Sequence, residues 1–389
     1  MNFMARERDL LATMVPELVE KLMTTPLVAL EQPGSPAIAW FKESACPGLL
    51  IPTDCGGCGL SPVEAIRAQR AIGALSPSLG VATTMHHFSV ASLITAAKST
   101  PGLGGLLLES IARDRLLVAS GFAEGQASRS ILLPTLTVAR RQGRLCINGS
   151  KKPCSLSKSM DLLTVSVASS DEHSPNGLSV ALVPRSAAGL SIRPFWKSPV
   201  LAAAESDEVV LTDVEIVPEL MVATRIDDGR LDTLQLIGFG WFELLLSATY
   251  IGVASALAER ALRSGRAGAD VVCGLEAAMS GLEGAAADLS TVLSQTATIA
   301  PPDRSSFDPR IGDAMLTRVL SCRYAAQDAI ESSVARALEA LGGVAFATSE
   351  DQVYLAGAAS ALKFHPPTRR AMGSSLVASY TDGSGLRVA

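Results

Sequence analysis

The sequence carries little net charge and no concentration of basic residues. Its formal net charge is −5 over 389 residues, and its Lys and Arg residues are scattered along the chain. Nucleic acids attract proteins through a basic patch or stripe, so we expect no nucleic-acid partner. Apolar residues make up 48% of the chain. This content excludes a disordered or fibrous protein and allows a large core over two or three domains or layers.

Long apolar runs are also missing. A helix that crosses a bilayer needs about 20 predominantly apolar residues in succession, and no run in this sequence approaches that length. Residues 1–22 carry charges where a signal peptide would need its apolar stretch. The sequence therefore predicts a soluble, cytoplasmic protein with no membrane partner.

The seven cysteines are odd in number and scattered, which fits reduced thiols better than a disulfide framework. Cys55 and Cys58 form a CGGC sequence, typical of a redox pair or of half a zinc site. A zinc site needs a second ligand pair at suitable spacing, and neither Cys46 nor the remote Cys146 and Cys154 supply one. We favour a glycine-rich turn with positive φ and predict no metal.

Hydrophobic periodicity divides the chain into three parts. Apolar residues recur every three or four positions in residues 1–118, which predicts helices. In residues 119–226, short β-branched runs separated by Gly, Pro, Asn and Asp predict antiparallel strands. Helical periodicity returns in residues 227–389. We predict a mostly helical α+β protein with an N-terminal helical domain (1–118), a middle antiparallel β domain (119–226) and a C-terminal domain like a four-helix bundle (227–389).

Several segments resemble acyl-CoA dehydrogenases, and they follow one another in that family's order. They are IPTDCGGCGLSPVEAIRAQRAIGALSPSLG, GFAEGQAS, LCINGSKKPCSLSKSMDLLTV, LTDVEIVP and LGGVAFATSEDQVYLAGAASALKFHPPT. The resemblance covers nearly the whole chain. It implies the family's fold, in which a flavin lies between the β domain and the helical bundle.

The resemblance also implies which residues of the β domain contact the flavin, FAD or else FMN. Phe122, Ala123 and Ser128 occupy the first loop along the ring, and Ala123 stands where the family has a threonine. Ser128 or Ser130 is a candidate donor to a flavin phosphate. Ser155 falls where a family threonine reaches flavin N5. Ordinary turn chemistry is the alternative explanation for these serines.

Three further residues that align with the family's flavin site lie in the C-terminal part. Gly342 and Gly343 align with glycines that approach the cofactor of a neighbouring subunit, although glycines are equally typical of a helix end. Thr368 aligns with a threonine beside the flavin. The family's arginine that meets the FAD diphosphate has no match near Gly268, which puts diphosphate binding in doubt.

The main departure from the family is Pro366, which stands where the catalytic glutamate is usual. The family's reaction removes a proton beside a thioester carbonyl, so a carboxylate must reach that carbon. Glu243 is one candidate base, and it lies one position away from the residue that serves as base in some relatives. The alternative is that Glu243 forms an ion pair with an arginine of the helical bundle. His365 is the second candidate base, because histidine can exchange a proton near neutral pH. The alternative role is structural, in which His365 packs beside the Pro366-Pro367 turn.

Adjacent histidines occur in a helix that lines the acyl pocket in the family. His86 and His87 are neighbours in sequence, so their side chains point in different directions on a helix. They therefore cannot form a metal pair, and at most one faces a substrate.

Three functions remain open. The main prediction is a flavin-dependent dehydrogenase or oxidase that acts on the CH–CH group of an acyl thioester held by CoA or a carrier protein. The second is a monooxygenase on the same scaffold that takes reduced flavin from a partner reductase; the missing base and missing diphosphate arginine favour it. The third is a catalytically inactive binding or partner subunit. The resemblance also implies a homo-oligomer, a dimer or a tetramer.

Overall fold

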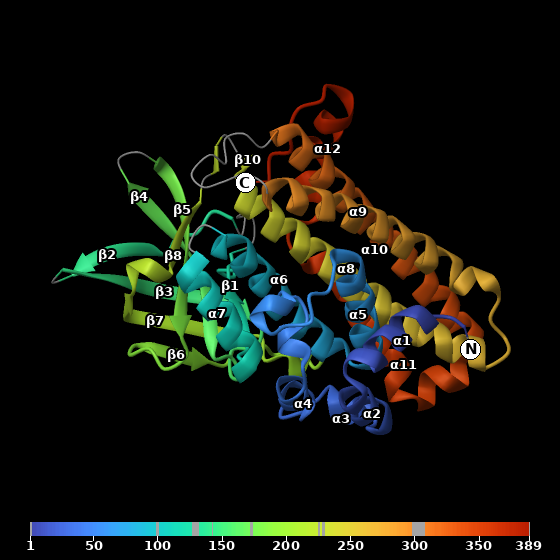
Figure 1. The fold of residues 1–389 in the computed structure, drawn as a ribbon. Coiled ribbons are helices and arrows are strands. Elements are labelled where there is room, and N and C mark those ends of the chain that lie inside the picture. Colours follow the sequence, from blue (N-terminus) through green and yellow to red (C-terminus); the bar gives the residue numbers. More distant parts are fainter. Residues whose placement is uncertain are drawn as a thin grey trace.

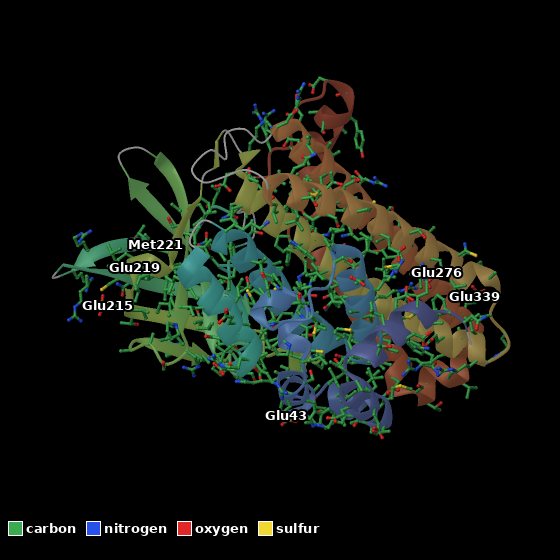
Figure 2. The ribbon with its side chains drawn as sticks, viewed as in Figure 1. Glu43, Glu215, Glu219, Met221, Glu276 and Glu339 are labelled. Carbon is green, nitrogen blue, oxygen red and sulfur yellow. The ribbon has the colours of Figure 1, made fainter. Side chains whose placement is uncertain are left out.

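The computed structural model describes residues 2–98, 101–126, 132–141, 143–171, 174–224, 226–227, 230–297 and 308–388. A β sheet forms one end of the molecule and long helices form the other, with N-terminal helices packed along one side (Figure 1). Figure 2 places Glu215, Glu219 and Met221 at the outer end of the sheet, and Glu276 and Glu339 towards the far end of the long helices.

Helices occupy the first part of the chain, and their starts follow local capping rules. Ser61 and Glu64 form a reciprocal capping box before α5, whose first residue is a proline. Pro16 separates α1 from α2, because proline cannot continue the preceding helix. The helices are α1 (Ala5–Met14), α2 (Pro16–Thr24), α3 (Leu27–Leu30), α4 (Ala37–Glu43), α5 (Pro62–Leu75), α6 (Pro77–Ala97) and α7 (Pro101–Asp114).

The CGGC segment is a tight turn. Gly56 has φ 81°, and a Cβ on Gly57 would lie 2.1 Å from the carbonyl oxygen of Ile51. Cys55 and Cys58 are free thiols. Backbone conformation and close approach therefore account for both glycines, as the sequence analysis favoured.

The sheet is mixed, which corrects the prediction of a purely antiparallel domain. Its order is β6-β7-β3-β2-β4-β5-β8, with β1 paired to β4. Most neighbours are antiparallel, whereas β1 and one bridge of β2 run parallel to β4. The β2–β3 hairpin lies between β1 and β4 in sequence, a connection long enough for parallel pairing. The strands are β1 (Val118–Gly121), β2 (Thr137–Arg141), β3 (Arg144–Cys154), β4 (Leu162–Asp171), β5 (Ser174–Pro184), β6 (Leu190–Arg193), β7 (Asp207–Ile216) and β8 (Met221–Thr224), and β9 (Ile226–Asp227) pairs with β10 (Arg230–Leu231) separately.

After the sheet, the described residues form the α-helices α8 (Thr233–Arg263), α9 (Cys273–Ala297), α10 (Pro309–Thr348), α11 (Glu350–Ala359) and α12 (Arg369–Thr381). Asp232 caps α8 by accepting a hydrogen bond from the Gln235 N–H. A kink interrupts α10 at Gly342, where φ is 82°. The left-handed conformation at this glycine is typical of a helix end.

Helix α8 is the central element of the fold. By length and composition it is apolar enough to cross a membrane, which the sequence analysis failed to anticipate, yet its most apolar window is completely buried inside the protein. It contacts α5, α6, α9, α10 and α11. Gly252 allows the close crossing with α5, because a Cβ there would lie 2.1 Å from the carbonyl oxygen of Arg70. The helix is therefore a core helix that other elements cover on all sides.

Candidate active site

A cavity of about 630 Å³ lies between the sheet, α6 and the start of α8. Pockets for cofactors and small molecules usually measure about 300–1,000 Å³, so this cavity can hold one. The lining side chains that matter here come from α6 (Phe88, Ser89), the sheet and its loops (Ser120, Phe122, Ala123, Pro153, Ser155, Thr164), α8 (Gly238, Phe239, Phe242) and the turn before α12 (His365, Pro366).

The cavity brings together four residues that the sequence analysis singled out. Phe122, Ala123, Ser155 and His365 all line it. Phe122 and Ala123 follow the end of β1, Ser155 follows β3, and His365 precedes α12. Pro366, which stands where the family's glutamate is usual, lines the cavity as well.

Other predicted residues lie elsewhere or outside the described part of the chain. Thr368 is exposed and caps α12, accepting a 3.3 Å hydrogen bond from the Ala371 N–H. Ser128 and Ser130 lie outside the described residues. Their proposed contact with a flavin phosphate stays a prediction.

Gly342 and Gly343 lie at the opposite end of the bundle from the cavity. Arg266, which follows the C-terminal end of α8, donates a 2.7 Å hydrogen bond to the carbonyl of Leu341, beside the kink. The cavity is lined by the N-terminal end of α8, up to Phe242. At 1.5 Å per residue, these two parts of α8 lie about 30 Å apart. The glycines therefore do not reach this cavity within one chain.

Glu243 forms a fully buried ion pair with Arg323 and is not among the residues that line the cavity. Arg323 Nη1 donates to Glu243 Oε2 at 2.6 Å. Burial raises the pKa of Glu243, and the adjacent Arg323 charge opposes that rise and favours the ionised carboxylate. The pairing with a bundle arginine, which the sequence analysis weighed as the alternative, is the contact present in the structure.

Arg323 and Tyr250 both bind His365. Arg323 Nη2 donates to the carbonyl oxygens of His365, at 2.6 Å, and of Leu362, at 3.3 Å. The Tyr250 hydroxyl lies 2.7 Å from His365 Nε2. Burial and the Arg323 charge lower the pKa of His365 to about 3, so its imidazole is neutral at pH 7. Sequence reasoning missed Tyr250 and Arg323, because only packing brings them to His365.

Phenylalanines form an aromatic wall along the cavity. The ring of Phe88 lies 5.2 Å from that of Phe242 and 6.2 Å from that of Phe122, in edge-to-face contacts. Phe239 stacks on Phe242 at 6.4 Å. Phe239 and Phe242 lie three residues apart on α8, a spacing from which their shared face could have been predicted. Among the described residues, no Asp, Glu, Lys or Arg side chain lines the cavity.

Hydroxyl groups lie on the sheet side of the cavity. The Ser155 hydroxyl is 2.9 Å from that of Ser206, and the Ser89 hydroxyl is 3.3 Å from that of Thr164. Ala123, where the family has a threonine, offers only its backbone, and its carbonyl accepts a 2.8 Å hydrogen bond from the Lys152 N–H. The sheet side is therefore polar and the α8 side is aromatic.

His86 and His87 are core residues and neither lines the cavity. His86 Nδ1 accepts a 3.0 Å hydrogen bond from the Val118 N–H, and its Nε2 lies 2.9 Å from the carbonyl oxygen of Pro47. His87 Nδ1 lies 3.2 Å from Gln69 Oε1. Burial lowers the pKa of His86 to about 4 and that of His87 to about 3. Both histidines hold the N-terminal helices together in their neutral forms.

The helices, sheet and bundle form a fold like that of the acyl-CoA dehydrogenases. Among solved structures, the FMN-bound dibenzothiophene monooxygenase TdsC of a Paenibacillus species matches with a TM-score of 0.83 and 19% identity, over 99% of both chains. A nitrososynthase of Micromonospora carbonacea matches with a TM-score of 0.74 and 18% identity, over 98% of this chain and 97% of that one. No protein-family model matches the chain.

Sequence comparison identifies the family more closely. Isobutylamine N-hydroxylase of Streptomyces viridifaciens is 38% identical over 380 residues, which is 97% of each chain. The chain belongs to the same family as that enzyme. These relatives agree with the monooxygenase alternative and give no support to the main prediction, oxidation of the CH–CH group of an acyl thioester.

Proposed function

We propose that this protein is a flavin-dependent monooxygenase that hydroxylates the nitrogen of a small apolar primary amine. The observation that carries the proposal is the 38% identity with isobutylamine N-hydroxylase over nearly the full length of both chains. The balanced reaction is amine plus O₂ plus reduced flavin, giving hydroxylamine, water and oxidised flavin. A partner reductase would supply the reduced flavin.

The residues around the cavity fit a flavin ring. Such a ring needs a flat, mostly apolar slot with a few hydrogen-bond donors. Phe122 and Pro153 offer apolar surface, and Ser155 and Thr164 offer hydroxyl groups on the sheet side. FMN and FAD both stay open, because the segment predicted to meet the phosphates includes Ser128 and Ser130, outside the described residues.

The absence of a base at Pro366 suits this chemistry. Reduced flavin, when bound, supplies the two electrons that activate O₂ for transfer of one oxygen atom to the substrate. The amine nitrogen attacks through its own lone pair, so no carboxylate has to remove a proton from carbon. Glu243, held by Arg323 behind the cavity, is not needed as a base.

His365 is the catalytic residue in this proposal. His365 lines the cavity and its imidazole is neutral, so we propose that its free N–H donates a hydrogen bond to a ligand oxygen. The Phe88, Phe239 and Phe242 wall excludes water from the same space. Water exclusion protects the activated oxygen until the amine is in place.

The apolar lining also favours a neutral amine with a hydrocarbon side chain. A primary alkylammonium ion has a pKa of about 10.4, as in lysine, and its charge is costly to desolvate without a carboxylate partner. The small fraction of uncharged amine at neutral pH is therefore the species that binds. It is also the species with the nucleophilic lone pair.

A direct test combines the purified protein with FMN or FAD, a flavin reductase, NADH, isobutylamine and oxygen-18 gas. We expect N-hydroxyisobutylamine that carries one oxygen-18 atom, detected by mass spectrometry. Anaerobic bleaching of bound flavin by butyryl-CoA, without product from the amine, would establish thioester oxidation instead. Failure to bind either flavin would leave the inactive-subunit alternative.

We also propose that the protein is a homo-oligomer. Large apolar side chains are exposed on the C-terminal helices, namely Val344, Phe346, Val353, Val377 and Tyr380. Val344 and Phe346 follow Gly342 and Gly343, the glycines that the family resemblance directs to a neighbouring subunit. Light scattering coupled to gel filtration tests this, and a monomer at micromolar concentration would contradict it.

A further inference from the structure

Two buried side chains, Tyr250 and Arg323, contact His365, and a third, Glu243, pairs with Arg323. Tyr250 comes from α8, Arg323 from α10, and Glu243 from α8 two turns before Tyr250. None of the three lines the cavity, whereas His365 does. Their contacts determine the backbone position and the tautomer of His365.

Arg323 fixes the backbone at His365. Its side chain and that of Glu243 are both 0% exposed, so the two opposite charges balance each other inside the bundle. The guanidinium then donates to the carbonyl oxygens of His365 and Leu362. A planar guanidinium with several fixed donors can hold an ion pair and a backbone turn at once.

Tyr250 fixes the tautomer of the imidazole. Burial raises the pKa of Tyr250, so its hydroxyl keeps its proton. Within the described residues, the hydrogen bond to His365 Nε2 at 2.7 Å is the one contact available to this hydroxyl as donor. A hydroxyl that donates to Nε2 requires that nitrogen to be unprotonated, which places the imidazole proton on Nδ1.

Burial and the Arg323 charge oppose a second proton on His365. The Arg323 guanidinium contacts its carbonyl, and the uncharged Tyr250 hydroxyl contacts its ring. The Tyr324 hydroxyl, from α10, donates to the carbonyl of Pro367 in the same turn. Glu243 faces Arg323 and not the imidazole. His365 Nδ1 has no hydrogen-bond partner among the described residues, so it is the nitrogen left for a ligand.

We propose that Tyr250 and the Arg323–Glu243 pair are positioning residues that hold His365 as the neutral Nδ1–H tautomer and present that N–H to the cavity as a fixed donor. The ligand group that it suits is an oxygen atom with acceptor lone pairs, such as the oxygen being transferred or released. This use of the donor rests on the proposed function, whereas the tautomer itself does not.

Nitrogen-15 NMR of the full-length, histidine-labelled protein tests the tautomer without any cofactor or substrate. The chain has four histidines, and His365→Gln assigns the relevant signals. We expect His365 to show a protonated Nδ1 and an unprotonated Nε2 between about pH 5.5 and pH 8. A protonated Nε2, or an imidazolium at pH 7, would overturn the proposal.

Tyr250→Phe should release this constraint. We expect the His365 signals of this variant to move towards the Nε2–H tautomer or a mixture of both tautomers. Tyr380→Phe is the matched control, because that hydroxyl is bonded to Ser321 on an exposed surface. Unchanged His365 signals in Tyr250→Phe would exclude Tyr250 as the positioning residue.

Kinetics then separates this inference from the proposed function. If the protein hydroxylates the amine, Tyr250→Phe should lower kcat about tenfold, as loss of an orienting partner does, and leave the KM for the amine unchanged. A combined change in KM and thermal stability would indicate a structural role and overturn the positioning role. A correct tautomer in a protein with no amine activity would refute the proposed function alone.

Discussion

The buried pair of Glu243 and Arg323 illustrates how much one residue depends on another inside this bundle. Both side chains are fully buried, and each is the charged partner of the other. Removing one member of such a pair leaves an uncompensated charge, whereas replacing both with apolar residues is often neutral or stabilising. The pair therefore offers a stability test that is independent of catalysis.

We predict that Glu243→Gln lowers the free energy of unfolding by about 3–5 kcal/mol. The double variant Glu243→Leu/Arg323→Met should be more stable than the single variant, because no buried charge then lacks a partner. Urea unfolding followed by circular dichroism measures both. Wild-type stability in Glu243→Gln would mean that another group balances Arg323.

His87 gives a prediction for the pH dependence of stability. Its folded-state pKa of about 3 lies below the value of about 6.5 in the unfolded chain, so the unfolded chain binds a proton more readily between these values. The contribution of His87 to the free energy of unfolding is therefore fully present above about pH 6.5 and is lost as the pH falls towards 3. Lowering the pH from 7 to 5 removes about 2 kcal/mol per such histidine.

We therefore expect the cost of His87→Asn, measured by urea unfolding, to be about 2 kcal/mol smaller at pH 5 than at pH 7. Asparagine keeps a donor for Gln69 but cannot take up the proton. Thr13→Ser, on an exposed surface, is a control whose cost should not vary with pH. An equal cost of His87→Asn at both pH values would mean that His87 does not titrate as described.

At the scale of elements, the crossing of α5 and α8 depends on glycine. A Cβ at position 252 would lie 2.1 Å from the Arg70 carbonyl oxygen, and one at position 73 would lie 2.3 Å from the Thr249 carbonyl oxygen. These are backbone atoms, so only a shift of the helices can make room. Overpacking of this kind usually costs about 1–3 kcal/mol.

We predict that Gly252→Ala lowers the unfolding free energy by about 1–3 kcal/mol and alters the cavity, because α8 must move away from α5. Gly373→Ala on α12 is the matched control. A Cβ there meets nothing within 4 Å, so the better helix propensity of alanine should be neutral or stabilising. Equal effects of the two substitutions in thermal unfolding would contradict the close crossing.

Local patterns predicted the types of elements better than their ends and directions. Strands such as β5 and β7 follow from β-branched alternation, and the long bundle helices follow from a three-to-four-residue repeat. The parallel pairing of β1 with β4 did not follow, because strand direction depends on long-range connections. The apolar length of α8 was also underestimated, since Glu243 interrupts the run in sequence but is buried in the fold.

At the scale of the whole molecule, three residues chosen from the family resemblance and one chosen for its chemistry lie around one cavity. Phe122, Ala123, Ser155 and His365 come from distant parts of the chain and surround one space. Arg323 and Tyr250 were not predicted, because an arginine and a tyrosine within apolar helices carry no local signal of their partner. Their relation to His365 arises only when α8, α10 and the turn before α12 pack together.

The aromatic wall yields a prediction about substrate size, which rests on the proposed function. Phe239→Ala should raise kcat/KM for hexylamine relative to isobutylamine by at least about tenfold, because the removed ring opens space for a longer chain. Trp40→Ala, an aromatic truncation on α4 away from the cavity lining, should leave this ratio unchanged. If Phe239→Ala leaves the ratio of kcat/KM for hexylamine to that for isobutylamine unchanged, the alkyl group of the amine does not lie against Phe239.

Helix α8 carries the rings of Phe239 and Phe242 that line the cavity and, two to three turns later, the tyrosine that bonds His365. Sliding or rotating this helix would therefore disturb size selection and proton placement together. Under the proposed function, we therefore expect relatives with different amine preferences to differ at cavity-lining residues of α6 and of the sheet. Substitutions there can change the cavity without moving α8.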